Sequence, residues 1–175
     1  MIVDFKQPQE MEIYRSLVRH LVQEGSSRLI ENDSVCHARV IIAELIFSAK
    51  VSIDIFCNRL APEVWADPTI VEAVKKAILS GVSIRLITSH APVDSSLLRL
   101  LEQSKVTRVI FPEGESLPNF IVVDSKAYRV EVDEERKQGV ACANGGDEAR
   151  RLAEVFLKML EKPSMSNSEG RNCAS

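Results

Sequence analysis

The sequence predicts an α/β domain in which a mixed, largely parallel sheet is flanked by helices on both faces, with extra helices at the N-terminus. Segments that alternate apolar and polar residues follow segments of helical periodicity through the middle of the chain. Two adjoining apolar runs near residue 122 form a hairpin pattern, which makes the sheet mixed. The chain has 175 residues, of which 45% are hydrophobic, and this is enough for one well-buried domain.

The N-terminal part is predicted to be helical. Residues 9–25 carry apolar side chains at helical spacing and end at Gly25, a common helix stop. A second helix is expected to begin after a cap at residues 32–34 and to continue through the apolar segment to residue 49. We predict three parts in all: a helical extension over 1–33, an α/β domain over 34–162 and a disordered tail over 163–175.

Three strands separated by two helices are expected next. The segment KVSIDIFC, residues 50–57, alternates as a strand does. The following helix has clear punctuation, since Asp67 can cap it, Pro68 suits its first turn and Gly81 ends it. Parallel strands joined by helices require right-handed crossovers, which is why the sheet is expected to be largely parallel. The remaining elements of this part are strands over 82–90 and 106–113 and a short helix over 94–104.

The last third predicts a hairpin and a closing helix. The segment LPNFIVVDSKAYRVE, residues 117–131, reads as two strands joined at Ser125-Lys126. A short strand over 140–144 follows. Residues 144–162 then carry the inner apolar stripe of an amphipathic helix.

Composition narrows the function classes. The formal net charge is −3, from 22 basic and 25 acidic residues, which is not the balance of a dedicated nucleic-acid-binding protein. The longest apolar stretch, VIIAELIF at 40–47, is too short to span a bilayer and is interrupted by Glu44. The N-terminus lacks the apolar core of a secretion signal. We therefore expect a cytoplasmic protein that does not associate with a membrane.

No cofactor or metal site is expected. Cys36, Cys57, Cys142 and Cys173 are far apart and form no C-x-x-C pair, so buried thiols in a reducing compartment are the expected state. The acidic residues at 131–135 can in principle hold a divalent cation. They lead directly into Arg136 and Lys137, however, which favours a solvated turn.

Residues 34–162 resemble the phospholipase D-like superfamily in the order of their elements and in the hairpin segment. That family carries the pattern H-x-K-x4-D on a strand, followed by an Asn-containing turn and a helix. Asp124, after the run FIVV, matches the family's Asp, and Asn144 matches its Asn. Counting back from Asp124 places Asn119 at the lysine position and Leu117 at the histidine position.

The resemblance implies a degenerate catalytic motif. In the family the histidine attacks phosphorus and the lysine neutralises the phosphate oxygens. Leu117 has no lone pair with which to attack, and Asn119 carries no charge to offer a developing oxyanion. What the resemblance leaves is a remnant site for an anion or another ligand, for which we predict Asn119, Asp124, Lys126, Glu131 and Asn144.

Two functional interpretations remain open. In the first, the chain is a catalytically inactive phospholipase D-like module that binds or dimerises, as a homodimer or with a protein partner. Recognition of nucleic acid in a prokaryotic defence or mobile-element system belongs to this interpretation. In the second, the chain is a phosphodiesterase or nuclease with a non-standard centre, in which His90 or Cys57, each near the end of a predicted strand, supplies the nucleophile.

Overall fold

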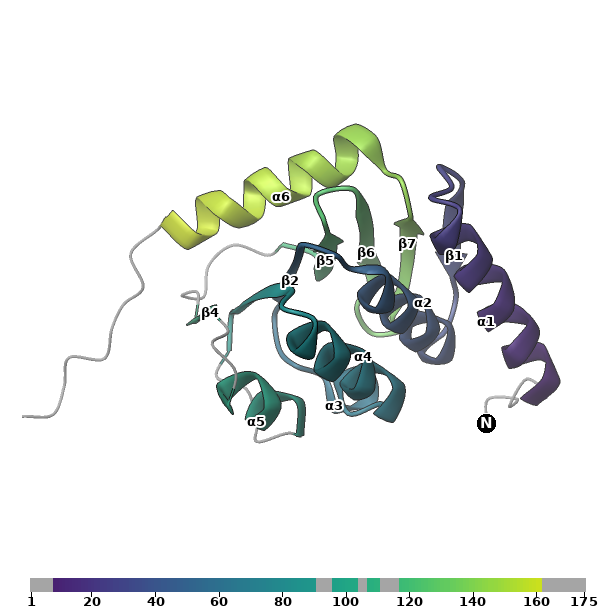
Figure 1. Ribbon diagram of the computed structural model, residues 1–175, viewed down its shortest axis with the longest axis horizontal. Helices are drawn as coiled ribbons and strands as arrows, with labels where there is room; N and C mark the ends of the chain where they lie inside the picture. Colours follow the sequence, from purple (N-terminus) through teal and green to yellow (C-terminus); the bar gives the residue numbers. More distant parts are fainter. Residues whose placement is uncertain (1–7, 91–95, 104–106, 111–116, 162–175) are drawn as a thin grey trace, which may run out of the picture.

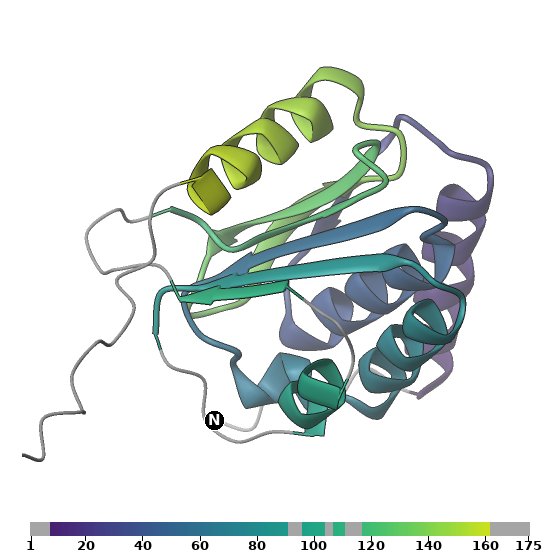
Figure 2. The same cartoon turned by 60° about the vertical axis from the view of Figure 1, so that its left-hand side comes forward.

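The computed structural model describes residues 8–90, 96–103, 107–110 and 117–161. Its centre is a seven-stranded sheet with the order β1-β7-β6-β5-β2-β3-β4 (Figures 1 and 2). The strands are Leu29–Asn32 (β1), Ser52–Cys57 (β2), Ser83–Thr88 (β3), Thr107–Ile110 (β4), Phe120–Val123 (β5), Ala127–Asp133 (β6) and Gln138–Cys142 (β7). The helices are Pro8–Gln23 (α1), Val35–Ser48 (α2), Pro62–Trp65 (α3), Pro68–Leu79 (α4), Ser96–Gln103 (α5) and Gly146–Glu161 (α6).

The sheet is mixed, but the prediction that it is largely parallel is wrong. Only the neighbours β2–β3 and β3–β4 run parallel among the described strands. The pairs β2–β5, β5–β6, β6–β7 and β1–β7 are all antiparallel. Strand β5 of the β5–β6 hairpin pairs with β2 and runs in the opposite direction. The pairs beyond it, from β5 to β1, are all antiparallel as well.

Helices cover both faces of the sheet, as the sequence predicts (Figure 2). On one face α6 packs over an aromatic cluster that contains Phe56, Phe120 and Phe156. On the other face α1, α2 and α4 cover a larger aliphatic core. Helix α2 is buried along nearly its whole length, which explains its continuous apolar sequence. Within the described ranges, no helix has both the length and the apolar character that a bilayer requires.

The residues predicted to cap and to end helices do so in the structure. The Ser34 side chain accepts a hydrogen bond from the His37 amide at the start of α2. Asp67 accepts from the Thr69 amide at 2.9 Å at the start of α4, and Gly81 has a φ of 77° just after that helix. These boundaries are confirmed.

Residues 1–33 do not form a purely helical segment. Helix α1 ends at Gln23, and residues 29–32 then form β1, the edge strand of the sheet. Ile30 and Asn32 face inward while Leu29 and Glu31 are exposed, a two-residue alternation too short to stand out in the sequence. The predicted tail over 163–175 lies outside the described residues.

Asp124 fastens the hairpin to the start of β2. Asp124 and Ser125 both have a φ of 53°, and the Lys126 amide donates to the Val123 carbonyl at 3.0 Å, so the turn is of type I′. The turn is therefore centred one residue earlier than the sequence predicts. The Asp124 carboxylate accepts three backbone hydrogen bonds, which come from the amides of Lys50 (2.9 Å), Val51 (2.8 Å) and Ser52 (2.8 Å).

Replacing Asp124 by Ala should lower the free energy of unfolding by about 1.5–3 kcal/mol, because hydrogen bonds to a charged acceptor are lost. Asp124→Asn should lose less, since Asn tolerates a positive φ and keeps one acceptor oxygen. Urea unfolding measures the effect. Glu135→Gln, at an exposed carboxylate of the β6–β7 turn, is the charge-matched control and should match the wild type. An Asp124→Ala variant as stable as the wild type would contradict the anchoring role.

Candidate functional site

Polar side chains gather at one end of the central strands, where β2 and β3 end and β5 begins. We call this rim of the sheet, formed by strand ends, the polar edge. Cys57 and Thr88 pair in register as the last residues of two parallel strands. The antiparallel pairing of Phe56 with Phe120 brings Asn119 to the same edge. In an α/β sheet the carboxyl ends of parallel strands are where ligands most often bind.

The Asn119 side chain is held at both ends of its amide. Its Oδ1 accepts a hydrogen bond from the Asn58 backbone amide at 2.8 Å, and its Nδ2 donates to Oε2 of Glu131 at 2.6 Å. The Glu131 backbone amide also donates to the Asn119 carbonyl at 2.8 Å. Because a carboxamide has one acceptor and one donor group, these bonds orient it fully. Asn119 and Glu131, both predicted site residues, are therefore partners of each other.

Asn58 is the centre of the remaining contacts at this edge. Its Nδ2 donates to Glu134 at 3.2 Å, and its Oδ1 accepts from the Ser89 hydroxyl at 3.2 Å. Its carbonyl oxygen accepts from the His90 amide at 3.0 Å and lies 3.1 Å from Nδ1 of the same residue. A carbonyl can only accept, so this contact favours the tautomer in which Nδ1 carries the proton and Nε2 keeps a lone pair.

Cys57 is placed as a core thiol rather than as an activated nucleophile. Burial raises the pKa of the Cys57 thiol well above its ordinary value of 9.0, and the negative charges of Glu131 and Glu134 raise it further. The sulfur is therefore protonated at neutral pH, whereas a nucleophilic cysteine needs a lowered pKa. The neighbouring Thr88 hydroxyl is fully buried and finds no hydrogen-bond partner in the described part of the chain.

Leu117, which the sequence resemblance places at the position of the family's nucleophile, is partly buried. Its side chain packs against the aromatic cluster beneath α6. A hydrocarbon side chain in this contact stabilises the core and has no means of attacking phosphorus.

The other three predicted remnant residues lie at the opposite edge of the sheet. Strand β5 separates Asn119, before its first residue, from Asp124, after its last. The Lys126 carbonyl accepts from the Gly145 amide at 2.8 Å, which places Lys126 and the exposed Asn144 beside the Asp124 turn. The structure therefore joins Asn119 with Glu131 but does not bring the five predicted residues into one site.

Arg129, the other basic residue of the hairpin, is engaged inside the fold. Its Nε donates to Oδ1 of Asn32 at 3.0 Å and its Nη2 donates to the Lys137 carbonyl at 2.9 Å. Burial lowers the pKa of this guanidinium, and the negative charge of Glu131 acts in the opposite direction. Its hydrogen bonds tie β6 to β1 and to the turn before β7.

Two carboxylates, Glu131 and Glu134, contact the asparagines of this edge, and the exposed Arg59 follows Asn58. Glu131 is buried beside Asn119 and Glu134 is exposed beside Asn58, whereas Asp133 accepts a hydrogen bond from the Arg136 amide. Across the described ranges, no group of three or more His, Cys, Asp or Glu side chains is arranged to hold a metal ion. The edge can accept hydrogen bonds from a cationic or donor group, and its carboxylates repel phosphate.

Comparison with solved structures identifies the fold. Nuc from Salmonella typhimurium, a phospholipase D family member, superimposes with a TM-score of 0.55 at 16% identity over 70% of this chain and 86% of Nuc. NucT from Helicobacter pylori gives a TM-score of 0.53 at 12% identity, over 77% of this chain and 94% of NucT. The fold is phospholipase D-like. No protein-family model and no curated protein matches the sequence.

A third similar structure is TrmBL2, an archaeal chromatin protein described for a novel mode of DNA binding. It superimposes with a TM-score of 0.57 at 14% identity over 90% of this chain, which spans 62% of TrmBL2. The fold therefore occurs in a protein that binds DNA as well as in a phospholipase D family member.

The buried Cys57 thiol should make stability depend on pH in the alkaline range. Above about pH 9 the unfolded chain loses a thiol proton that the folded protein retains. The stabilising contribution is thus complete below pH 9 and is lost as pH rises, by up to about 1.4 kcal/mol per pH unit. Urea unfolding of wild type and Cys57→Ala under reducing conditions from pH 7.5 to 10.5 measures it.

The stability advantage of the wild type over Cys57→Ala should narrow above pH 9. Ile55→Val changes a buried residue on the same strand that does not ionise. Its free energy of unfolding should therefore differ from that of the wild type by the same amount at every pH in the range. A constant difference for Cys57→Ala over the whole range would show that the thiol ionises equally in both states.

Proposed function

We propose that this chain is a phospholipase D-like module that recognises a partner and does not cleave phosphodiester bonds. The observation that carries the proposal is the state of the two positions that would perform the chemistry. Leu117 packs against the core, and the Asn119 amide is fixed between Asn58 and Glu131. Neither position offers a nucleophile or a positive charge to a phosphate.

The charge at this edge favours a protein partner over a nucleic acid. Glu131 and Glu134 lie where a phosphate-binding site would need cations, so a nucleic-acid backbone is repelled there. Basic and hydrogen-bond-donating groups of a protein surface complement the same carboxylates. Nucleic acid remains the alternative partner, supported by the DNA binding described for TrmBL2. We propose a prokaryotic defence or mobile-element system as the biological setting, by analogy with other proteins of this fold.

A phosphodiesterase with a non-standard centre is the second candidate, and His90 is the residue that favours it. The contact of its Nδ1 with the Asn58 carbonyl favours the tautomer in which Nε2 carries the lone pair that a nucleophile needs. Cys57 is a weaker candidate for that role, because its thiol is buried and protonated.

Hydrolysis assays distinguish the two candidates. With bis(4-nitrophenyl) phosphate and a single-stranded oligonucleotide, the wild type and His90→Ala should both stay at the rate of buffer alone. His20→Ala, at an exposed histidine of α1, is the matched control for loss of an imidazole. Hydrolysis that His90→Ala abolishes and His20→Ala retains would replace the binding module with an enzyme.

We propose further that the module forms a homodimer through this edge, since an isologous pair is the usual arrangement for identical chains. A twofold axis can place the exposed Glu134 of one copy against the exposed Arg59 of the other, which would form two equivalent ion pairs. Sedimentation velocity at micromolar concentration should then show a species of twice 19.5 kDa.

Charge reversal tests this interface. Glu134→Arg should weaken the dimer, and adding Arg59→Glu to it should restore association, because the ion pair is re-formed with its signs exchanged. Glu154→Arg, at an exposed position of α6, should leave the dimer unchanged. A wild-type protein that sediments as a strict monomer would remove the homodimer from the proposal.

A further inference from the structure

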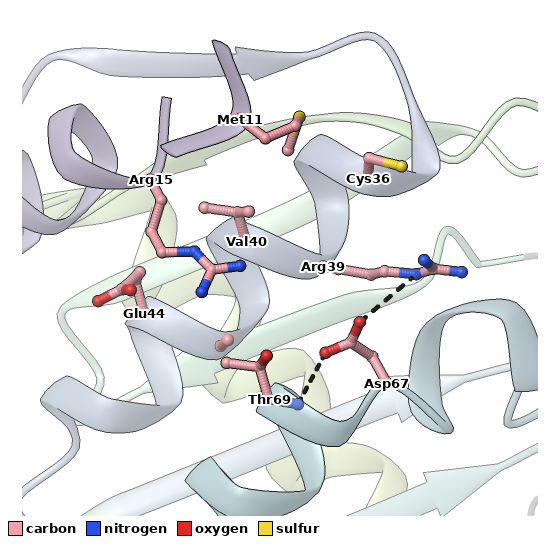
Figure 3. A pocket seen from close by; sticks show the side chains of 9 residues that line it. Met11, Arg15, Cys36, Arg39, Val40, Glu44, Asp67 and Thr69 are labelled. Carbon is pink, nitrogen blue, oxygen red and sulfur yellow. Dashed lines mark hydrogen bonds and ion pairs between the residues drawn. The ribbon is translucent and has the colours of Figure 1, made fainter. Parts of the chain in front are cut away.

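A second site lies in the helical layer, away from the polar edge of the sheet. A pocket of about 190 Å³ opens between α1, α2 and the start of α4 (Figure 3). Side chains of α1 and α2 meet there with Asp67 and Thr69 at the start of α4, and none of the residues discussed at the sheet edge lines it. The residues that matter for its chemistry are Met11, Arg15, Arg39, Val40, Glu44 and Asp67.

The two carboxylates of the pocket already have partners. Glu44 is buried, and both of its oxygens accept from Arg19, at 2.9 and 3.2 Å. Asp67 caps α4 through the Thr69 amide, and its other oxygen lies 3.9 Å from Nε of Arg39. These negative charges are therefore compensated by groups of the protein itself.

Arg15 is different. Figure 3 shows its guanidinium pointing into the middle of the pocket, beside Val40, and no dashed line joins it to another residue. Within the described residues it makes no hydrogen bond or ion pair. Arg19, which lies outside the pocket lining, pairs with Glu44, and Arg39 lies 3.9 Å from Asp67, so neither carboxylate of the lining is paired with Arg15.

The shape of the pocket limits what can neutralise that charge. Val40 lies beside the guanidinium, and Met11 and Ala43 also contribute apolar side chains to the pocket lining. A guanidinium binds a carboxylate through two parallel hydrogen bonds, and an aliphatic body can pack on the apolar wall. A volume of about 190 Å³ is below that of sites for drug-sized ligands, so the ligand is small. A dianion such as phosphate fits less well, since only one charge needs a partner.

We propose that this pocket binds a small aliphatic monocarboxylate, with the carboxylate on Arg15 and the hydrocarbon against Met11, Val40 and Ala43. The ligand would join α1 to α2, and would add to the Arg19–Glu44 pair that already connects these helices. This binding is independent of the function proposed for the sheet edge.

Titration of the ¹⁵N-labelled protein with butyrate, followed by amide chemical shifts, tests the site. Up to about 20 mM butyrate, in the range expected for a very small ligand, should shift the amides of Arg15, Val40 and Thr69 saturably. Butyramide has the same size as butyrate but no charge, so the charge-assisted hydrogen bonds are missing. Its affinity, measured from the same amide shifts, should be at least about tenfold lower. Inorganic phosphate should also bind more weakly than butyrate.

Variants locate the binding group. Arg15→Met keeps the length of the side chain and should reduce butyrate affinity about tenfold or more, whereas Arg15→Lys should retain part of it. Arg28→Met, at an exposed arginine of the α1–β1 loop, should bind as the wild type does. Within the described residues Arg15 makes no hydrogen bond or ion pair that the substitution would break, and an unchanged amide spectrum of ligand-free Arg15→Met, outside the pocket residues, verifies its folding.

Three results would overturn the proposal. They are an absence of saturable shifts with butyrate, equal shifts with butyrate and butyramide, and undiminished binding by a folded Arg15→Met protein.

Discussion

The antiparallel pairing of β5 with β2 is the constraint on which the arrangement of this molecule depends. Its register sets Ile53 against Val123 and Phe56 against Phe120. One end of β5 is thereby placed beside the end of β2, where Asn58 follows, and the other end beside the start of β2, where Ser52 lies. Residues that are five apart in the sequence, Asn119 and Asp124, consequently belong to opposite edges of the sheet.

Each edge uses its polar residue differently. At the start of β2 a carboxylate collects three backbone amides and stabilises a turn with positive φ angles. At the other edge an asparagine amide joins a backbone amide to a buried carboxylate. Chains of hydrogen bonds of this kind strengthen one another and rigidify the groups in them. The Asn119 amide is thereby held in a fixed surface of hydrogen-bonding groups.

Much of the fold could be predicted from the sequence, because its signals are local. The caps at Ser34 and Asp67 are local because their side chains accept hydrogen bonds from backbone amides two or three residues further on. The stop at Gly81 is local because a glycine readily adopts the positive φ that ends a helix. The hairpin of β5 and β6 was predictable for the same reason. The direction of β5 relative to β2 was not, since pairing between strands more than sixty residues apart leaves no trace in either strand's periodicity. The four-residue strand β1 was missed because it completes only two alternations.

The candidate site was predicted in part. Asn119 was found through the family motif and Glu131 in the segment that follows it, and the two side chains are hydrogen-bonded to each other. Asp124, Lys126 and Asn144 matched the same motif or its surroundings but lie at the other edge, because a linear motif does not state which residues a strand separates. Asn58 and Ser89 were not predicted as site residues. Asn58 directly follows the last residue of β2 and Ser89 directly follows the last residue of β3. Ligands often bind at the carboxyl ends of parallel strands, so this position was a signal that could have found them.

The central claim is that the Asn119 amide is held by its bonds to Asn58 and Glu131 and does not bind phosphate. Exchange of its side-chain amide protons with water, followed by nuclear magnetic resonance, measures this directly, with the exposed Asn144 amide in the same molecule as the reference. The account predicts exchange at Asn119 slower by about tenfold or more than at Asn144, and resonances that do not move when a single-stranded oligonucleotide is added. Exchange at Asn119 as fast as at Asn144, together with a shift on adding the oligonucleotide, would contradict it.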